Sequence, residues 1–463
     1  MSFTKKKYNT HYVPSLFLFI AIFLLSFGTM MIDNNLSIII VTLLGLSIGI
    51  GFAALLIKRK NLSTSIYIFL LFFLIYFIHT VIITYGLIVF YDTVHIKIDE
   101  SYFYKSSIDV AYKLNQGYTI VDIFNIQRYG DVPAAVYMNG QIARVADIFG
   151  RNSIMVQKIF VLMFSAFIPM VMYNISRLYL TEKESIISAF IYGFFSFVPY
   201  LSSMILRDVH VAFTFIIVIF ITLQKLSIKN LIILLAVSTL SYFLREQTGV
   251  FLLGFTSVYI FALIHNLLRN FYMELFLYMI ILGIIIIIIV NSSLMDMFNT
   301  ILNSSGERQV AQAASGSMGA KLAKLPYGLN IIGLFGYGQI QPFPFTYIFT
   351  KSTYKGFFQI TYIMAGIAWL LGWGFLLYGV FKRKILTRID LKLQLILLFS
   401  MAYLLLIAVV EFGVRRQMPV YPVLYMIMVF SYLELDNNKR NKIWITMASL
   451  YLTITIIFYF LKF

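Results

Sequence analysis

Long apolar stretches recur along most of this chain and constrain its fold more than any other feature. Hydrophobic residues make up 60% of the 463 residues and charged residues only 12%, whereas a soluble domain carries about 25% charged residues. A helix needs about 20 apolar residues to cross a bilayer. The pattern predicts an all-α integral membrane protein in a single domain, 1–463. The predicted spans, about thirteen, are 12–32, 36–57, 63–91, 154–177, 185–205, 209–226, 230–243, 248–268, 271–291, 356–380, 390–412, 417–433 and 443–461.

The distribution of basic residues predicts how the spans are oriented. Lysine and arginine favour the cytoplasmic side of a membrane protein, and the run Lys5–Lys7 places the N-terminus there. With alternating spans, the other strongly basic connections, 58–60, 382–392 and 439–442, also face the cytoplasm. The net charge of +17 is therefore mainly a signal of orientation and of contact with membrane lipids. No soluble segment carries the basic face of a nucleic-acid-binding protein. We expect a plasma (inner) membrane protein.

Two long connections, 91–153 and 292–355, lie on the extracytoplasmic side in this arrangement. The first has helical periodicity over 99–115, where Asp99 is a candidate N-cap, and over 132–149. Both segments are expected to be interfacial helices. The second is rich in Ser, Gly and Ala over 303–328, which leaves two interpretations open, a lid or a flexible tether. Cysteine is absent, which excludes disulfides and thiolate metal sites.

Ionisable residues gather at the extracytoplasmic ends of the predicted spans. Charges there are costly unless they are paired or functional. Singly, each is explained by snorkelling or by topology; together they predict a cavity with carboxylates on one side and guanidinium groups on the other. No Asp, Glu, Lys or Arg lies near the middle of a span, which argues against an ion-coupled transporter. The residues are Asp99, Glu100, Arg207, Asp208, Arg245, Glu246, Glu411, Arg415 and Arg416.

Three motifs in these segments resemble the GT-C superfamily of membrane glycosyltransferases, in particular bacterial relatives of the protein-mannosyltransferase and aminoarabinose-transferase type. The first external loop opens on Asp99 with Tyr104 one place later than in the family pattern, and continues with Ala111, Leu114 and Gly117. The segment 197–213 is similar to the family's proline, serine and arginine-acidic segment. The segment 414–427 is similar to its late arginine with two spaced prolines. The chain departs from those relatives that carry a soluble C-terminal domain.

The resemblance implies a GT-C-like fold and transfer of a sugar from a polyprenyl-phosphate-linked donor to a glycan, lipid or polymer acceptor of the cell envelope. Asp99 would take the proton of the attacking hydroxyl. Glu100 is the alternative base, or a ligand with Asp99 of a divalent metal ion; no cofactor is otherwise implied. Guanidinium groups would stabilise the leaving phosphate. The candidates are Arg207, Arg245, Arg415 and Arg416, supported by Asp208, Glu246, Glu411 and Tyr104.

Other functions remain open at this stage. A polysaccharide polymerase of the O-antigen or capsule type would act on repeat units linked to polyprenyl diphosphate and use the same arginines, with less need for Asp99. A lipid-linked glycan flippase or transporter would need a cationic central cavity. A membrane scaffold would leave the charges at the helix ends dispensable.

Overall fold

The computed structural model describes residues 11–95, 98–129, 132–268, 328–340, 359–382, 384–410 and 414–462, together with 272–273, 276–277, 322 and 325–326. All regular elements in these residues are helical, which confirms the all-α class. Six described helices are long and apolar enough to cross a membrane, so the chain is a multi-pass membrane protein. The number of thirteen crossings stays a prediction. Glu411 and most of the predicted loop 292–355 lie outside the described residues.

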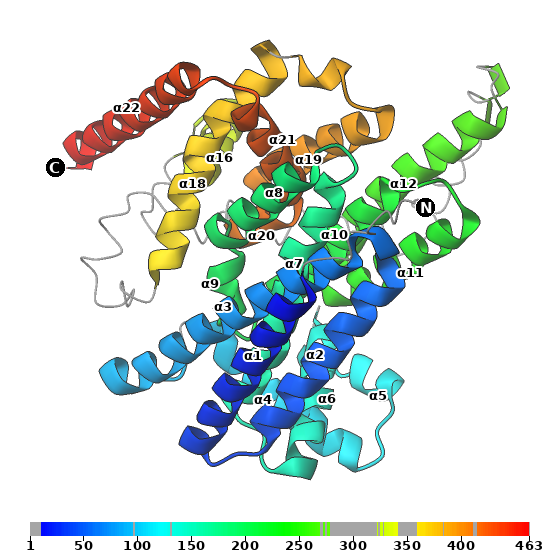
Figure 1. Ribbon diagram of the computed structural model, residues 1–463, viewed down its shortest axis with the longest axis vertical. Helices are drawn as coiled ribbons and strands as arrows, with labels where there is room; N and C mark the ends of the chain where they lie inside the picture. The colour runs from blue at the N-terminus through cyan, green and yellow to red at the C-terminus, as the bar shows by residue number, and fades with distance from the viewer. Residues whose placement is uncertain are drawn as a thin grey trace, which may run out of the picture.

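The first half of the chain forms a tightly packed bundle with a helical cap at one end. Its elements are α1 (Tyr12–Asp33), α2 (Ser37–Leu56), α3 (Arg59–Tyr91), α4 (Ile98–Asn115), α5 (Ile120–Phe124), the short turn η1 (Gln127–Tyr129), α6 (Pro133–Phe149), α7 (Ile154–Ser176), α8 (Glu182–Phe195), α9 (Val198–Ser202) and α10 (Arg207–Thr222). Figure 1 shows α4, α5 and α6 gathered at the end where α1 turns into α2.

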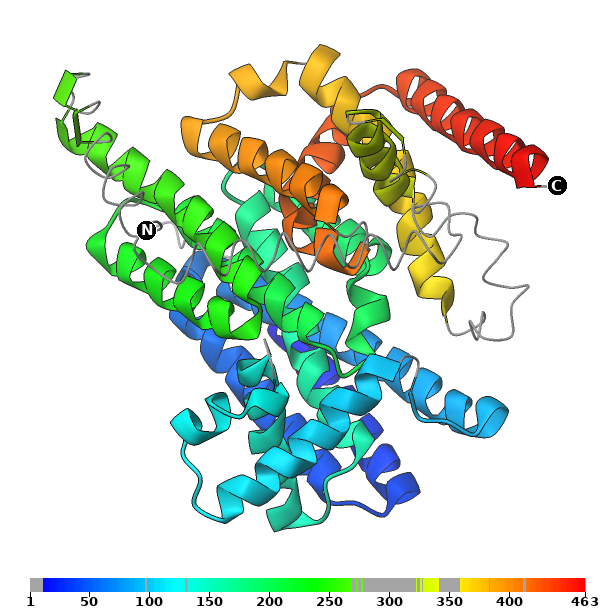
Figure 2. The same ribbon diagram turned by 180° about the vertical axis from the view of Figure 1, so that it is seen from behind.

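The second half covers one side and the opposite end of this bundle. Its elements are α11 (Ile228–Leu244), α12 (Glu246–Leu268), α16 (Leu329–Ile340), α18 (Ile360–Leu377), the π-helical turn η4 (Tyr378–Lys382), the short turn η5 (Ile385–Thr387), α19 (Leu391–Val410), α20 (Val414–Gln417), the short turn η6 (Met418–Val420), α21 (Tyr421–Leu433) and α22 (Asn437–Lys462). In Figures 1 and 2, α22 projects away from the body. It contacts α18 and exposes large apolar side chains such as Ile445 and Leu452, as a lipid-facing helix does.

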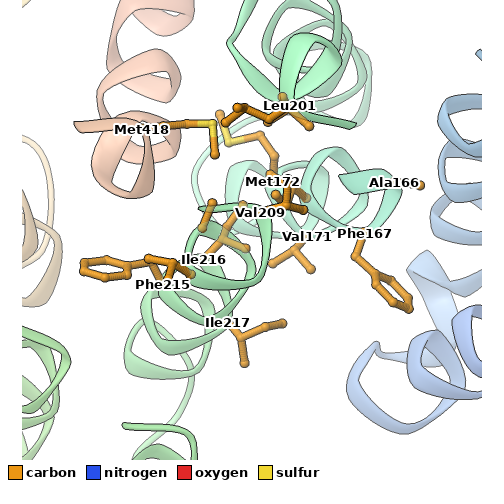
Figure 3. Close-up of a cluster of buried hydrophobic side chains, with 14 of the residues drawn as sticks. Ala166, Phe167, Val171, Met172, Leu201, Val209, Phe215, Ile216, Ile217 and Met418 are labelled. Atoms are coloured by element: carbon orange, nitrogen blue, oxygen red, sulfur yellow. The ribbon is translucent and has the colours of Figure 1, made fainter. Parts of the chain in front are cut away.

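Helix α7 is the centre of the core. It packs against α2, α3, α8 and α10, and 83% of its most apolar stretch is buried. Figure 3 shows Val171 and Met172 of α7 meeting Val209 and Ile216 of α10. Leu201 of α9 and Met418 of η6 lie in the same cluster. The segments that carry the second and third motifs are therefore joined through this core.

The predicted span 185–205 is wrong as one helix, because the structure breaks it into α8 and α9. Helix α8 begins with a capping box, in which Thr181 and Glu184 exchange side-chain and backbone hydrogen bonds. It ends at Phe195, and the Ser196 hydroxyl accepts a hydrogen bond from the amide of Val198 at 3.2 Å. Pro199 in the next turn has no amide hydrogen for a continuous helix. After the break, the Ile205 amide lies beside Glu100 of α4, and the Asp208 carboxylate lies beside Arg245 and Arg415.

The two helices predicted in the first large connection are confirmed, at Ile98–Asn115 and Pro133–Phe149. Asp99 is not an N-cap, because α4 already includes Ile98 and Asp99 lies in the first turn. The helices also pack closely on each other: a Cβ atom on Gly140 would overlap the side chain of Val110. Helix α6 additionally contacts α2, α7 and α11, so this cap is part of the folded body.

A polar cluster closes the same cap. Asp109 accepts hydrogen bonds from Lys113 and from the Tyr129 hydroxyl, both at 2.6 Å. Arg128 lies 3.9 Å from the same carboxylate. Burial raises the pKa of Asp109, but the hydrogen bonds and positive charges around it outweigh burial, so the pKa lies below its usual value. These contacts join α4 to η1 and explain how a long polar connection is ordered.

Candidate functional site

Four charged side chains from distant parts of the chain meet beside the first turn of α10. We call Asp99, Asp208, Arg245 and Arg415 the charge cluster. Arg415 Nη1 lies 3.2 Å from Asp99 Oδ2 and 3.8 Å from Asp208 Oδ2. Arg245 Nη2 donates to Asp208 Oδ1 at 2.9 Å. Arg415 therefore bridges two carboxylates, and Asp208 lies between two guanidinium groups.

Helix ends position each member of the charge cluster. Asp208 lies in the first turn of α10, where the helix dipole favours a negative charge. Arg245 has an extended backbone at the junction between α11 and α12, and its side chain reaches Asp208 of α10. Arg415 lies on the four-residue helix α20. The sequence predicted that these ends share one side of the membrane, and the structure brings four of the nine predicted charges into contact.

The charge cluster runs from a buried end to an exposed end. The side chains of Asp208 and Arg245 are 5% and 8% exposed, whereas those of Arg415 and Asp99 are 31% and 56% exposed. Burial raises the pKa of Asp208, but Arg245 and Arg415 outweigh it and hold that pKa below its usual value. Burial lowers the pKa of Arg415, but Asp208 and Asp99 outweigh it and raise that pKa. Asp208 and Arg415 are thus charged at neutral pH.

Glu100 is separated from the charge cluster despite being next to Asp99. Its carboxylate is fully buried and lies 3.2 Å from the equally buried Nζ of Lys158 on α7. We call Glu100 and Lys158 the buried pair. Residues that are adjacent on a helix point about 100° apart, so one turn of α4 sends Asp99 toward solvent and Glu100 into the bundle.

Neighbouring segments satisfy the remaining hydrogen bonds of the buried pair. The amide of Ile205 donates to Glu100 Oε1 at 3.3 Å. Lys158 donates to the Thr84 hydroxyl at 3.3 Å and to the carbonyl of Val94 at 3.1 Å. The buried pair therefore ties α3, α4, α7 and the segment between α9 and α10 together. In this position Glu100 is fully buried, and its role as the alternative base stays a prediction.

Sequence reasoning missed Lys158. It is the fifth residue of the predicted span 154–177, where a lysine looks like an ordinary snorkelling charge. The available signal was a lysine inside an apolar stretch, near the same predicted membrane side as the pair Asp99-Glu100. Only packing reveals that Lys158 and Glu100 meet.

Three of the other predicted site residues are neighbours in sequence of the charge cluster. Arg207 and Arg416 are half-buried neighbours in sequence of Asp208 and Arg415, and Glu246 follows Arg245 at the start of α12. The Arg416 carbonyl accepts a hydrogen bond from the Tyr403 hydroxyl at 2.8 Å. Tyr104 is half-buried one turn beyond Glu100, with its ring 6.2 Å from that of His95. Their functional roles stay predictions.

A metal site would need several oxygen or nitrogen ligands around one point. Among the described residues, no group of three or more His, Cys, Asp or Glu side chains is placed to hold a metal ion. Asp99 pairs with Arg415 and Glu100 with Lys158, so the two carboxylates have separate partners. The metal-ligand role suggested for them stays a prediction.

The charge cluster offers an exposed carboxylate that can accept a proton, beside a guanidinium group that can bind an anion. Comparison with known proteins adds no assignment of this site. No protein-family model matches the chain, and no curated protein or solved structure is significantly similar to it.

Proposed function

We propose that this protein transfers a sugar from a polyprenyl-phosphate-linked donor to a cell-envelope glycan, lipid or polymer acceptor on the extracytoplasmic face. The observation that carries the proposal is Asp99, a 56% exposed carboxylate held 3.2 Å from Arg415 at a cluster built from four distant segments. The motif resemblance of these segments to GT-C glycosyltransferases supports it, and about thirteen spans in a GT-C-like arrangement are part of the proposal.

The proposed reaction uses the two exposed members of the charge cluster directly. The acceptor hydroxyl oxygen forms a bond with the anomeric carbon of the sugar, and its proton passes to the Asp99 carboxylate. The bond from that carbon to the phosphate oxygen breaks, and polyprenyl phosphate leaves. A phosphate with a second pKa of about 6 is a stable leaving group near neutral pH and needs no proton donor. Arg415 stabilises its developing charge.

The free energies of exposed and buried ion pairs indicate which pairs open when the sugar donor binds. An exposed ion pair contributes only about 0–1 kcal/mol, so a phosphate can displace Asp99 from Arg415 at little cost. Breaking a buried pair costs about 3–5 kcal/mol, so Arg245 stays with Asp208. In this scheme Arg415 moves between carboxylate and phosphate, while Arg245 and Asp208 form its fixed support.

A polysaccharide polymerase is the second candidate, favoured by one specific observation. The Asp99 carboxylate is already paired with Arg415, so its role in the structure can be to hold the arginine rather than to take up a proton. In a polymerase the pair would only position Arg415, which would bind the diphosphate of a polyprenyl-linked repeat unit. The two candidates differ in whether Asp99 needs its negative charge.

Orientation can be tested directly, because the chain has no cysteine. We expect Gln116→Cys, at an exposed position after α4, to react with a membrane-impermeant maleimide in intact cells. Thr387→Cys, at an exposed position in the basic segment 382–392, should react only after permeabilisation. The physical reason is the positive-inside distribution of lysine and arginine. The reverse labelling pattern would place the charge cluster on the cytoplasmic side and exclude an external site.

Removing Arg415 should weaken both binding of the sugar donor and turnover. The phosphate is charged in the ground state and in the transition state, so Arg415→Ala should raise KM and lower kcat. Arg415→Lys should recover only part of the loss, because lysine lacks the planar fork of arginine. The measurement is transfer from a synthetic polyprenyl-phosphate sugar by purified protein in detergent.

Arg388→Ala is the matched control. Arg388 is also an exposed arginine in an ion pair, with Glu434 at 3.5 Å, but it lies outside the charge cluster. Equal activity of the Arg415 and Arg388 variants would refute a phosphate-binding role for Arg415.

A further inference from the structure

A buried polar network lies directly behind Arg415. Gln417, on the same short helix α20, is fully buried. Its Oε1 accepts hydrogen bonds from Gln339 Nε2 at 3.0 Å and from the Tyr421 hydroxyl at 3.2 Å. Gln339 Oε1 in turn accepts from Trp369 Nε1 at 3.1 Å. We call Gln339, Trp369, Gln417 and Tyr421 the glutamine network.

The hydrogen-bond donors and acceptors of the glutamine network can be assigned in only one way. Indole nitrogen is a hydrogen-bond donor only, so the oxygen of the Gln339 amide must face Trp369. The amide nitrogen of Gln339 then faces α20 and requires the oxygen of Gln417. The Trp369 ring also stacks on Tyr421, with ring centroids 3.8 Å apart. A single N–H group therefore fixes the rotation of two buried amides.

The glutamine network holds the face of α20 that is opposite to Arg415. Positions two apart on a helix differ in direction by about 200°, so Gln417 points into the bundle while Arg415 points to the charge cluster. A further contact fixes the backbone between them: the Tyr403 hydroxyl of α19 donates to the Arg416 carbonyl at 2.8 Å. A helix of four residues has little stability of its own, so these contacts determine where it lies.

We propose that Gln339 and Gln417 are positioning residues that hold Arg415 toward Asp99 and Asp208. Gln339 belongs to α16, within the second large connection 292–355, so this connection would contribute to the site through α20. As a statement about catalysis the inference rests on the proposed function. As a statement about the position of α20 it is independent of it.

The first test measures position without activity. In the cysteine-free chain, Asp99→Cys and Arg415→Cys together place two thiols where the ion pair was, and a short thiol-reactive crosslinker reports how often α4 and α20 approach. Adding Gln417→Leu should slow crosslinking about tenfold, the order expected when buried partners lose a hydrogen bond. Gln417→Glu keeps the accepting oxygen and should recover part of the rate.

Two tryptophans of α18 provide a matched pair for the same test. Trp369→Phe keeps an aromatic ring next to Tyr421 but removes the N–H that orients Gln339. Trp373→Phe removes an indole N–H, one turn further along α18, that has no hydrogen-bond partner among the described residues. Crosslinking should slow in the Trp369 variant and stay unchanged in the Trp373 variant. Equal rates in the two, or no effect of Gln417→Leu, would overturn the inference.

The second test connects position to catalysis. With Asp99 and Arg415 intact, Gln339→Leu should raise KM for the polyprenyl-phosphate sugar about tenfold with a smaller change in kcat, and should add little in an Arg415→Ala background. Full additivity would contradict a role through Arg415. If wild-type protein transfers no sugar, the proposed function fails, and the crosslinking rates alone decide the inference. Slowed crosslinking then still supports the glutamine network as the support of α20.

Discussion

Asp99→Asn is expected to abolish sugar transfer while the protein stays folded and inserted in the membrane. Asparagine has the same size and keeps an oxygen that can accept a hydrogen bond from Arg415, but it cannot take the proton of the acceptor hydroxyl. Loss of a general base typically lowers the rate about 10²–10⁴-fold. Because Asp99 is 56% exposed, the substitution should barely change the free energy of unfolding. The measurement is kcat with a synthetic polyprenyl-phosphate sugar, alongside a thermal unfolding curve in detergent.

Asp436→Asn is the control for this prediction. Asp436 is equally exposed, at 54%, and also forms an ion pair, with Lys439 at 2.7 Å. Its variant should transfer sugar at the wild-type rate. Full activity of Asp99→Asn together with inactive Arg415→Ala would favour the polymerase, which needs the arginine but not the base. Full activity of both variants would leave the charge cluster without a catalytic role.

Lys158→Met is expected to give the largest loss of stability of any single substitution considered for this protein. It would remove the closest cation from the buried Glu100 carboxylate, whose other ionisable neighbour is His95 with Nδ1 3.8 Å away. Removing one partner of such a pair costs about 3–5 kcal/mol. Replacing both partners with apolar residues of similar volume is often neutral or stabilising. The double variant Glu100→Leu, Lys158→Met should therefore recover most of the loss. Unfolding in detergent micelles, followed by heat or denaturant, measures both.

Lys439→Met is the matched control, because Lys439 forms an exposed ion pair whose contribution is about 0–1 kcal/mol. A wild-type unfolding curve for Lys158→Met would mean that the two side chains do not form a buried pair in the membrane. A stable double variant with reduced transfer would add a second conclusion. The buried pair would then fix the first turn of α4, and hence the position of Asp99, more than it stabilises the fold.

Hydrophobicity and periodicity predicted the helices well where local signals agree. The cap helices 99–115 and 132–149 were placed to within one residue, because apolar positions at helical intervals act locally. The predicted span 185–205 was wrong as one helix, because the hydropathy of a segment does not reveal a break in its backbone hydrogen bonding. Ser196 and Pro199 mark the break, and their effect depends on backbone hydrogen bonds that hydropathy does not measure.

By itself, the sequence determined that the chain is an all-α membrane protein, and it predicted that nine charges share one membrane side. Both follow from composition and from charge near apolar spans, which are local properties. Only the tertiary structure decided how those charges are paired. Arg415 reaches Asp99 across 316 residues of sequence, and no periodicity encodes that contact. Asp99 and Glu100 look equivalent in sequence, yet the packing of α4 on α7 exposes one and buries the other. The rotation of a single helix turn, fixed by Lys158, separates the candidate catalytic carboxylate from the structural one.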